Sequence, residues 1–297
     1  MSSEPEIRCE RRGDLMVVTL NRPHALNALS FAMCQVLDAG LVAWREDPAV
    51  RAVLIKGSGE RAFCAGGDIR SLYHTLTTEG VAAATDFYAV EYPMNARLRH
   101  FPKPYIALLD GIVMGGGVGV SVHGSHRVVT EKTVFAMPET TIGFFPDVGA
   151  TYVLPRLPGR LGLHLGLTSA RLGAADCRAV GIGTHFTPTA RLGALEQALI
   201  EADLSGDPFA AVDRVLDEFG SDPGPATLPA LRTQIDRCYG RPDLEHVLQA
   251  LAEETSGWGA AQLEQLRSKS PTSLAVTFRQ LCIGATLEFD AAVRLEY

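Results

Sequence analysis

The stretch PYIALLDGIVMGGGVGVSV, residues 104–122, decides the fold class. Its first part, PYIALLDG (104–111), is a continuous apolar run, which predicts a strand that is buried on both faces. The glycine-rich part that follows leads into an apolar segment that we expect to be helical. A buried strand that passes through a tight turn into a helix is typical of an α/β layer fold.

Strand and helix patterns alternate along the first half of the chain. Apolar, β-branched runs at 14–23 and 50–59 predict strands, and 126–137 predicts two short extended segments. Ser30 is a good N-cap and precedes apolar residues at helical spacing, which predicts a helix over 30–47. This alternation supports the α/β prediction through about residue 137.

The rest of the chain differs because its strand signal fades after about residue 155. Segments with helical periodicity follow, separated by Pro, Gly or Asp. We therefore predict a core over residues 1–190 and a helical C-terminal region over residues 191–297. The turn-rich segment GSDPGPATLP (220–229) is the best candidate for a linker. The last residues still have a helical pattern, so we expect further sequence or fraying there.

Composition and charge exclude several classes of partner. The 297 residues are 46% hydrophobic and 21% charged, an ordinary globular mixture, and the formal net charge is -7. The sequence has no cluster of Lys and Arg, so we expect no nucleic-acid partner. No apolar run has the length of a membrane span and the first residues have no apolar core, so we expect no membrane partner and no targeting segment.

The six cysteines are scattered, with no C-x-x-C motif and no histidine at zinc-finger spacing. This pattern indicates reduced thiols, so we expect a cytoplasmic location and no metal site. Four histidines have no carboxylate or cysteine partner at a telling spacing in the sequence. We expect them to be satisfied or surface side chains: His123, His126, His164 and His185.

Two glycine-rich loops, ERAFCAGGDIRSLY (60–73) and DGIVMGGGVGVSVHG (110–124), are candidates for a binding site. Each follows a predicted strand and leads toward a helix, where backbone N–H groups are unpaired. The two loops could aim one N–H each at the same oxygen, as in an oxyanion hole. Tight strand-to-helix turns without a ligand are the alternative. Neither loop matches a phosphate-binding motif, because Val120 occupies the last slot of G-x-G-x-x-G.

Glu139 and Asp147 lie eight residues apart in the otherwise apolar stretch AMPETTIGFFPDVGA (136–150). Apolar surroundings raise the pKa of a carboxyl group toward the range that is useful for proton transfer. The alternatives are that Asp147 caps a helix beginning near Val148 and that Glu139 is exposed at the surface. Capping is a good explanation of Asp147 alone, and the surface alternative explains Glu139 less well.

These motifs, in this order and spacing, resemble the crotonase (enoyl-CoA hydratase/isomerase) superfamily. The resemblance covers residues 12–190 strongly and rests on four segments: NRPHALNALS (21–30), RAFCAGGDI (61–69), PKPYIALLDGIVMGGGVG (102–119) and MPETTIGFFPDVGATYVLPRL (137–157). It implies an α/β fold, a crotonase-like spiral of ββα units with a helical C-terminal region. It also implies an acyl-coenzyme A substrate, with no further cofactor and no metal. Trimers are frequent in the superfamily, so a homo-oligomer is one expectation.

The resemblance also implies roles for individual residues. The N–H groups of Gly67 and Gly116 would hold the thioester carbonyl oxygen. Glu139 would act as a general base or as a nucleophile that forms a mixed anhydride, and Asp147 would orient the substrate hydroxyl or handle a proton. Glu91 matches a glutamate that contacts the substrate. Seven further residues would line the substrate site: Ala25, Leu26, Ala65, Gly66, Asp68, Ile69 and Gly115.

One position separates the branches of the superfamily. Hydratases carry a second glutamate two residues after the GGG run, and this chain has Gly119 there. The motifs resemble instead the 3-hydroxyisobutyryl-CoA hydrolase branch. That resemblance implies hydrolysis of a short branched 3-hydroxyacyl-CoA thioester to the free acid and coenzyme A, in valine catabolism. The alternatives are an enoyl-CoA hydratase or isomerase on the same fold and a non-catalytic acyl-CoA-binding protein.

Overall fold

The computed structural model describes residues 4–297, which form two compact units. Unit 1 contains the chain up to Phe135 together with Gly173–Gly224, and unit 2 contains Ala136–Leu172 together with Pro225–Tyr297. The chain passes from unit 1 to unit 2 for the second time between Gly224 and Pro225, inside the predicted linker 220–229. This division differs from the predicted boundary at residue 190, because residues 191–224 of the predicted helical region belong to unit 1.

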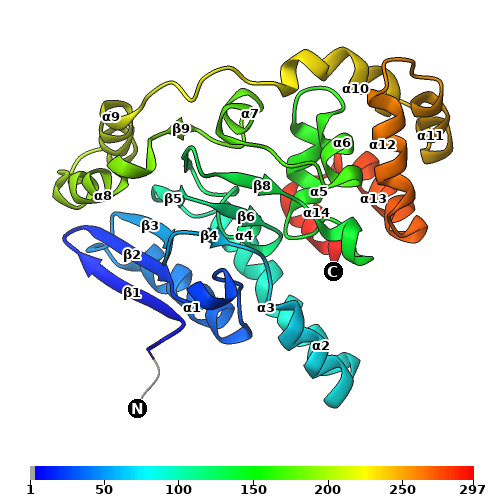
Figure 1. Ribbon diagram of the computed structural model, residues 1–297. Coiled ribbons are helices and arrows are strands. Elements are labelled where there is room, and N and C mark those ends of the chain that lie inside the picture. Colours follow the sequence, from blue (N-terminus) through cyan, green and yellow to red (C-terminus); the bar gives the residue numbers. More distant parts are fainter. Residues whose placement is uncertain (1–3) are drawn as a thin grey trace. The chain divides into compact units, whose positions relative to one another are not determined.

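Unit 1 is built on two sheets (Figure 1). The six-stranded sheet has the order β1 (Ile7–Arg12), β2 (Leu15–Leu20), β3 (Ala52–Gly57), β5 (Tyr105–Leu109), β7 (His126–Val129) and β9 (His185–Phe186). The three-stranded sheet has the order β4 (Ala62–Cys64), β6 (Ile112–Met114) and β8 (Val134–Ala136). The strands β1 and β2 are antiparallel, whereas the pairs that follow in the large sheet are parallel. The strands that were expected from the sequence are therefore present.

The apolar strands at the centre of the large sheet are covered on both faces. Every residue of β2 and of β5 is buried, as expected for parallel strands between two layers. The register pairs Leu15 with Ala52 and Val53 with Tyr105. Because β4 and β6 are also parallel neighbours, their C-terminal ends deliver the two glycine-rich loops to the same edge of the small sheet.

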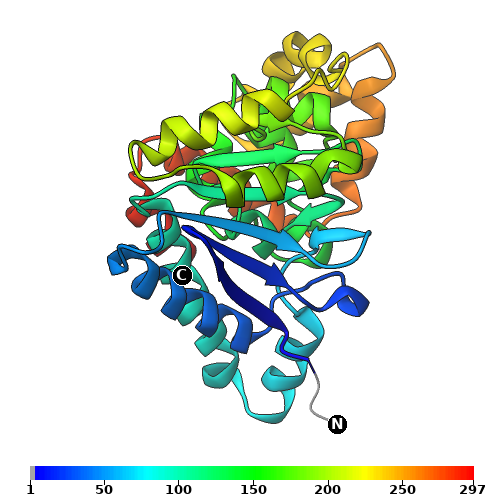
Figure 2. The same ribbon diagram turned by 90° about the vertical axis from the view of Figure 1, so that its left-hand side faces the viewer.

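Helices from the predicted C-terminal region cover one face of the large sheet. The helices α8 (Leu192–Glu201) and α9 (Pro208–Phe219) bury Leu195, Leu199 and Leu216 against Leu54 and other strand residues. Figure 2 shows these two helices in front of the strands. Their apolar faces explain why this segment belongs to unit 1. The other helices of unit 1 are α1 (Phe31–Glu46), α2 (Ile69–Thr78), α3 (Val81–Arg99), α4 (Gly116–Gly119) and α7 (Ala174–Ala179).

The helix α1 forms as the sequence predicts. Ser30 is its N-cap and accepts a hydrogen bond from the N–H of Met33 at 3.2 Å. Its apolar residues recur at helical spacing and are buried: Met33, Cys34, Leu37, Leu41 and Trp44. The helix α4 differs from expectation because it ends after four residues. Glycine is a poor helix former, and the chain continues in turns to Gly124.

Unit 2 is helical. His164 packs at its centre, with ring centroids 5.2 Å from Tyr239 and 6.1 Å from Trp258. Burial lowers the pKa of His164 to about 4, so this imidazole is neutral at physiological pH. The α-helices are α5 (Ala150–Val153), α6 (Leu161–Thr168), α10 (Arg232–Tyr239), α11 (Leu244–Ala252), α12 (Trp258–Arg267), α13 (Pro271–Gly284) and α14 (Phe289–Glu296). Within residues 4–297, no helix combines the length and apolar character that crossing a membrane requires.

Candidate functional site

The first glycine-rich loop of unit 1 is fixed to the segment at residues 25–29. The N–H of Leu29 donates to the carbonyl of Gly66 at 2.8 Å, and the N–H of Asp68 donates to the carbonyl of Leu29 at 2.9 Å. The N–H of Ala65 donates to the carbonyl of Leu26 at 3.0 Å. These bonds form because Gly66 has φ 117, a conformation that residues with a side chain rarely adopt. The predicted substrate-lining residues 25–26 and 65–69 thus lie side by side.

The second glycine-rich loop approaches the first at the level of the backbone. A Cβ atom on Gly117 would lie only 2.3 Å from the carbonyl oxygen of Cys64, so this position excludes every side chain. Gly115 has φ 50 and ψ -124 and starts the short helix α4. Glycine is required at both positions, at Gly115 for its backbone conformation and at Gly117 for the close approach to Cys64. The two predicted loops are therefore brought together.

Gly67, Gly116 and Glu91 converge where the two loops meet. A Cβ atom on Gly116 would lie 3.2 Å from the amide nitrogen of Gly67 and 2.7 Å from Oε1 of Glu91. Within residues 4–297, the N–H groups of Gly67 and Gly116 donate no hydrogen bond to another residue. Gly116 is the first residue of a helix, where an N–H has no intrahelical acceptor. Two free N–H donors side by side can hold one oxygen that carries negative charge.

Glu91 is buried on α3 and has an exposed fraction of 2%. Its charge contributes to the raised pKa values of two buried thiols, Cys34 and Cys64. Burial and then the charge of Glu91 raise the pKa of Cys34 well above its usual value, and burial is the main cause that raises the pKa of Cys64 to about 12. Both thiols are therefore protonated at physiological pH, which makes them poor nucleophiles.

Asp68, one of the predicted substrate-lining residues, has a structural role. Its carboxylate accepts from the N–H of Ser71 at 3.1 Å, which caps α2, and pairs with Arg22 at 2.8 Å. Burial alone would raise the pKa of Asp68, but these bonds hold it below its usual value. The salt bridge links the loop to the segment after β2, so the side chain of Asp68 shapes the site.

A pocket of about 290 Å³ opens beside Gly67 in unit 1. Leu29, Asp68 and Phe87 are among its lining residues, and the ring of Phe87 lies 3.3 Å from where a Cβ atom of Gly67 would be. Glu79 and Asp86 also line it. A carboxylate at either position would repel an anionic group such as a phosphate from this pocket.

Glu139 belongs to unit 2, where it begins the short 3-10 helix Glu139–Ile142. Its exposed fraction is 5%, so the surface alternative for this residue is wrong. The helix is anchored from α12: the Nζ of Lys269, which follows that helix, donates to Oγ1 of Thr141. Ser169 bonds to Oγ1 of Thr140 at 2.9 Å. Lys269 and Ser169 thus hold the segment that carries Glu139 through the hydroxyl groups of Thr141 and Thr140.

Asp147 is also buried in unit 2, with an exposed fraction of 6%. The capping alternative for this residue is wrong, because α5 begins at Ala150 and its N-cap residue is Gly149. The carbonyl of Asp147 accepts from the N–H of Ala150 at 2.9 Å. Asp147 is therefore not the N-cap residue of this helix.

Sequence reasoning missed Glu296, whose carboxyl group takes the capping role. It accepts the N–H of Gly149 at 2.7 Å and the N–H of Thr151 at 2.9 Å. The signal in the sequence is an acid on an apolar face, because Phe289, Ala292, Val293 and Glu296 recur at helical spacing and are all buried.

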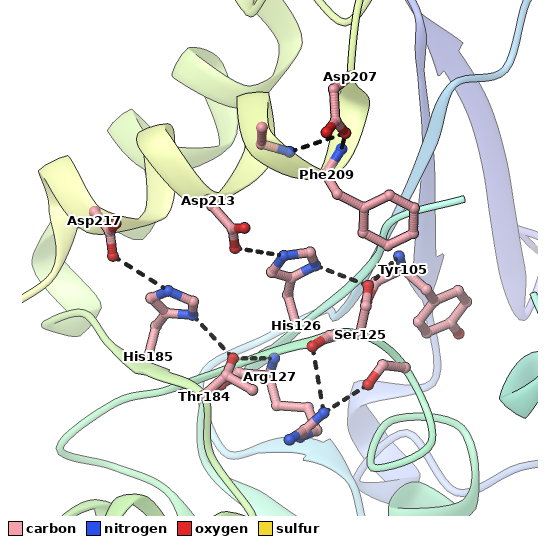
Figure 3. A network of polar contacts seen from close by, with 12 residues as sticks. Tyr105, Ser125, His126, Arg127, Thr184, His185, Asp207, Phe209, Asp213 and Asp217 are labelled. Atoms are coloured by element: carbon pink, nitrogen blue, oxygen red, sulfur yellow. Dashed lines mark hydrogen bonds and ion pairs between the residues drawn. The ribbon is translucent and has the colours of Figure 1, made fainter. Parts of the chain in front are cut away.

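Two histidines of unit 1, His126 and His185, have carboxylate partners on a helix that is distant in the sequence (Figure 3). His126 pairs with Asp213 at 3.0 Å, and His185 lies 3.6 Å from Asp217. Both aspartates lie on α9. Burial lowers the pKa of both imidazoles, although the aspartates oppose that shift. The expectation of satisfied histidines therefore holds for this pair. Within the described residues, no three His, Cys, Asp or Glu side chains could together hold a metal ion.

A model of the enoyl-CoA hydratase/isomerase family matches residues 15–297. The chain belongs to the enoyl-CoA hydratase/isomerase family. The 3-hydroxyisobutyryl-CoA hydrolase of Xenopus tropicalis, named as mitochondrial, is 44% identical over 95% of this chain and 74% of that enzyme. The 3-hydroxyisobutyryl-CoA hydrolase 1 of Arabidopsis thaliana is 42% identical over 96% of this chain and 76% of that enzyme.

The solved structures of the family confirm the predicted fold. A carnitinyl-CoA dehydratase from Mycobacterium thermoresistibile has a TM-score of 0.92 at 39% identity and covers 98% of this chain and 84% of its own. An enoyl-CoA hydratase from Rhodobacter sphaeroides 2.4.1 has a TM-score of 0.88 at 38% identity. It covers 99% of this chain and 83% of its own. The predicted crotonase-like α/β fold with its helical C-terminal region is thus correct.

The family relatives also correct one prediction. The hydrolases of Xenopus tropicalis and Danio rerio are named as mitochondrial, so the expectation of a cytoplasmic location is wrong. That expectation rested on scattered cysteines, which indicate reduced thiols but do not distinguish one reducing compartment from another.

Proposed function

We propose that this member of the family hydrolyses a short branched 3-hydroxyacyl-CoA thioester, such as 3-hydroxyisobutyryl-CoA, to the free acid and coenzyme A. The observation that carries the proposal is the close approach of Gly67 and Gly116, whose N–H groups donate no hydrogen bond within residues 4–297. Such a pair stabilises the negative charge that develops on a thioester oxygen when the carbonyl carbon is attacked. The relatives named as 3-hydroxyisobutyryl-CoA hydrolases support the choice of substrate, which would place the enzyme in valine catabolism.

The position of Gly119 favours hydrolysis over hydration. The resemblance places the second glutamate of a hydratase at this residue, which lies buried in α4 and offers no side chain. Without a second carboxylate there, the site lacks one of the two acids that such a hydratase would use to add water across a double bond. Hydrolysis needs only one group to activate water or to attack the carbonyl.

Glu139 is the residue that we assign to this step, by one of two routes. As a general base, it takes a proton from water, the hydroxide attacks the carbonyl carbon, the C–S bond breaks, and the thiolate of coenzyme A receives the proton. As a nucleophile, its carboxylate attacks the carbonyl carbon and expels the thiolate, and water then hydrolyses the mixed anhydride. Acid quenching in the first turnover followed by intact-protein mass measurement distinguishes the routes, because only the second adds an acyl group to the protein.

Asp147 and Glu91 are assigned to substrate orientation. Both are buried carboxyl groups, and a buried carboxylate is a strong acceptor for a hydroxyl group. Asp147 would accept from the 3-hydroxyl of the substrate, and Glu91, next to Gly116, would fix the acyl chain at the oxyanion hole. The chemistry uses no cofactor beyond the coenzyme A that the substrate carries.

A thiol-release assay tests the proposal. We expect 3-hydroxyisobutyryl-CoA to release free thiol much faster than isobutyryl-CoA, and crotonyl-CoA to keep its conjugated double bond. The solved relatives named as a hydratase and a dehydratase favour the second candidate, an enoyl-CoA hydratase. Rapid loss of the crotonyl-CoA absorbance without thiol release would support that candidate and contradict hydrolysis. Saturable binding of every thioester without turnover would instead indicate a non-catalytic acyl-CoA-binding protein.

A further inference from the structure

The segment that carries Asp147 has an unusual backbone. Val148 has φ 52 and Gly149 has φ 87, so two consecutive residues adopt the left-handed conformation. For a β-branched residue such as valine this conformation is strained, because its Cβ substituents crowd the backbone. Strain of this kind persists only where the surrounding structure holds the segment in place, and it is found most often at functional sites.

Two buried side chains from the C-terminal helices hold this segment on both sides of Asp147. Before it, the Nε2 of Gln280 on α13 donates to the carbonyl oxygen of Pro146. After it, the carboxyl group of Glu296 on α14 accepts hydrogen bonds from the N–H of Gly149 through Oε2 and from the N–H of Thr151 through Oε1. Each oxygen of Glu296 thus has its own donor, which fixes the geometry more tightly than a single bond does.

Packing alone does not account for a carboxyl group at residue 296. The side chain completes an apolar stripe formed by Phe289, Ala292 and Val293, where an apolar residue of similar size would cost no desolvation. Burial, and to a smaller extent the charge of Asp147, raise the pKa of Glu296 to about 8 against the effect of its N–H donors. The carboxyl group therefore lies within electrostatic reach of Asp147, and its ionised form is disfavoured where it stands.

We propose that Glu296, together with Gln280, is a positioning residue that fixes the strained segment at Val148 and so sets the orientation of Asp147 toward the substrate hydroxyl. This inference rests on the proposed function, in which Asp147 accepts a bond from that hydroxyl. Glu296 acts only through the backbone of residues 149–151. Its loss therefore reduces the preference for hydroxylated thioesters, whereas it leaves the thioester carbonyl site at Gly67 and Gly116 unaltered.

The test is Glu296→Gln, in which the amide keeps one acceptor and places an NH₂ group against an N–H donor. Thiol release is measured with 3-hydroxyisobutyryl-CoA and with isobutyryl-CoA, and kcat and KM are determined for each. We expect kcat for the hydroxylated thioester to fall by about tenfold, with little change in KM and little change for isobutyryl-CoA. The matched control is Glu288→Gln, an exposed glutamate that precedes the same helix, which should behave as wild type.

The combination of Glu296→Gln with Asp147→Asn separates positioning from general stabilisation. If Glu296 acts through Asp147, the double variant has the same preference as Asp147→Asn alone. Additive losses, or an unchanged preference in folded Glu296→Gln, would overturn the proposal. If Glu296→Gln does not fold, Gln280→Met removes the bond to Pro146 at similar volume, and a wild-type preference in that variant would also overturn it.

The same experiment distinguishes this proposal from the proposed function. A wild-type protein that releases no thiol from either thioester contradicts the proposed function, and the positioning role fails with it. Wild-type turnover that prefers the hydroxylated thioester, together with the same preference in Glu296→Gln, contradicts only the positioning role.

Discussion

The α-carbon of Gly116 faces the amide of Gly67 so closely that a Cβ atom on Gly116 would lie 3.2 Å from that nitrogen. The same Cβ atom would lie 2.7 Å from Oε1 of Glu91. The space between these groups is therefore large enough for a substrate oxygen only while residue 116 has no side chain. This relationship makes the proposed oxyanion hole testable by the smallest possible substitution.

Gly116→Ala keeps the backbone N–H but blocks access to it, so kcat/KM for 3-hydroxyisobutyryl-CoA should fall by about 10²–10³, as much as when one oxyanion donor is lost. The methyl group would occupy the position of the carbonyl oxygen and press on the tip of Glu91. Steady-state thiol release measures the effect, and a thermal melt verifies folding. The control is Gly193→Ala, since Gly193 lies in α8 with open space around its α-carbon. An active Gly116→Ala enzyme would remove the oxyanion hole from the proposal.

Glu139→Gln should reduce turnover by about 10²–10⁴, the range that a general base contributes, and should leave binding of a non-hydrolysable acyl-CoA unchanged. The amide is isosteric but neither takes up a proton nor attacks a carbonyl. Binding is measured by calorimetry and turnover by thiol release. Glu245→Gln, an exposed glutamate of α11, is the control in the same unit. Near-normal turnover in Glu139→Gln would show that another group activates the nucleophile.

The buried His126 and the half-buried His185 should make the protein less stable in acid. Burial lowers the pKa of both imidazoles, so the folded protein binds fewer protons than the unfolded chain below about pH 6.5. The free energy of unfolding should therefore fall as the pH decreases through that value. Urea unfolding at pH 7.5 and pH 5.5 measures the slope. The slope should be smaller in His126→Gln and unchanged in His24→Gln, an exposed histidine; equal slopes in all three proteins would contradict the assignment.

The raised pKa of Glu296 predicts that the protein loses stability as the pH rises. Burial raises the pKa of Glu296 from 4.5 to about 8, so the folded state keeps a proton that the unfolded chain has lost between these values. The free energy of unfolding should therefore fall as the pH rises through this window and become constant above it. Urea unfolding from pH 6 to pH 9 measures the fall, which Glu296→Gln should reduce. A wild-type slope in that variant would assign the effect to another group.

The sequence was sufficient for those parts of the fold that depend on local pattern. The buried strand β5, the Ser30 cap of α1 and the approach of the two glycine loops follow from apolar periodicity, capping preference and the special backbone of glycine. Glu139 and Asp147 were found because acids are rare in apolar stretches, and their burial agrees with that reasoning. Their catalytic roles remain predictions.

The features that the sequence did not reveal depend on contacts between distant segments. Glu296 bonds to Gly149 across 147 residues, and His126 bonds to Asp213 across 87. No spacing rule connects such pairs, because their distance is set by how helices pack and not by the period of a helix or a strand. The same reasoning explains why α8 and α9 belong to unit 1, since only the packed sheet shows which apolar face they cover.

The discontinuity of unit 1 has a consequence for biosynthesis. One apolar face of the large sheet is covered by residues of α8 and α9, which leave the ribosome long after β2, β3 and β5. Until residue 216 has emerged, Leu195, Leu199 and Leu216 cannot cover that face, and the nascent chain exposes apolar surface that promotes aggregation. The protein should therefore depend on chaperones during this interval, and slower translation of the codons for residues 136–216 would lengthen it.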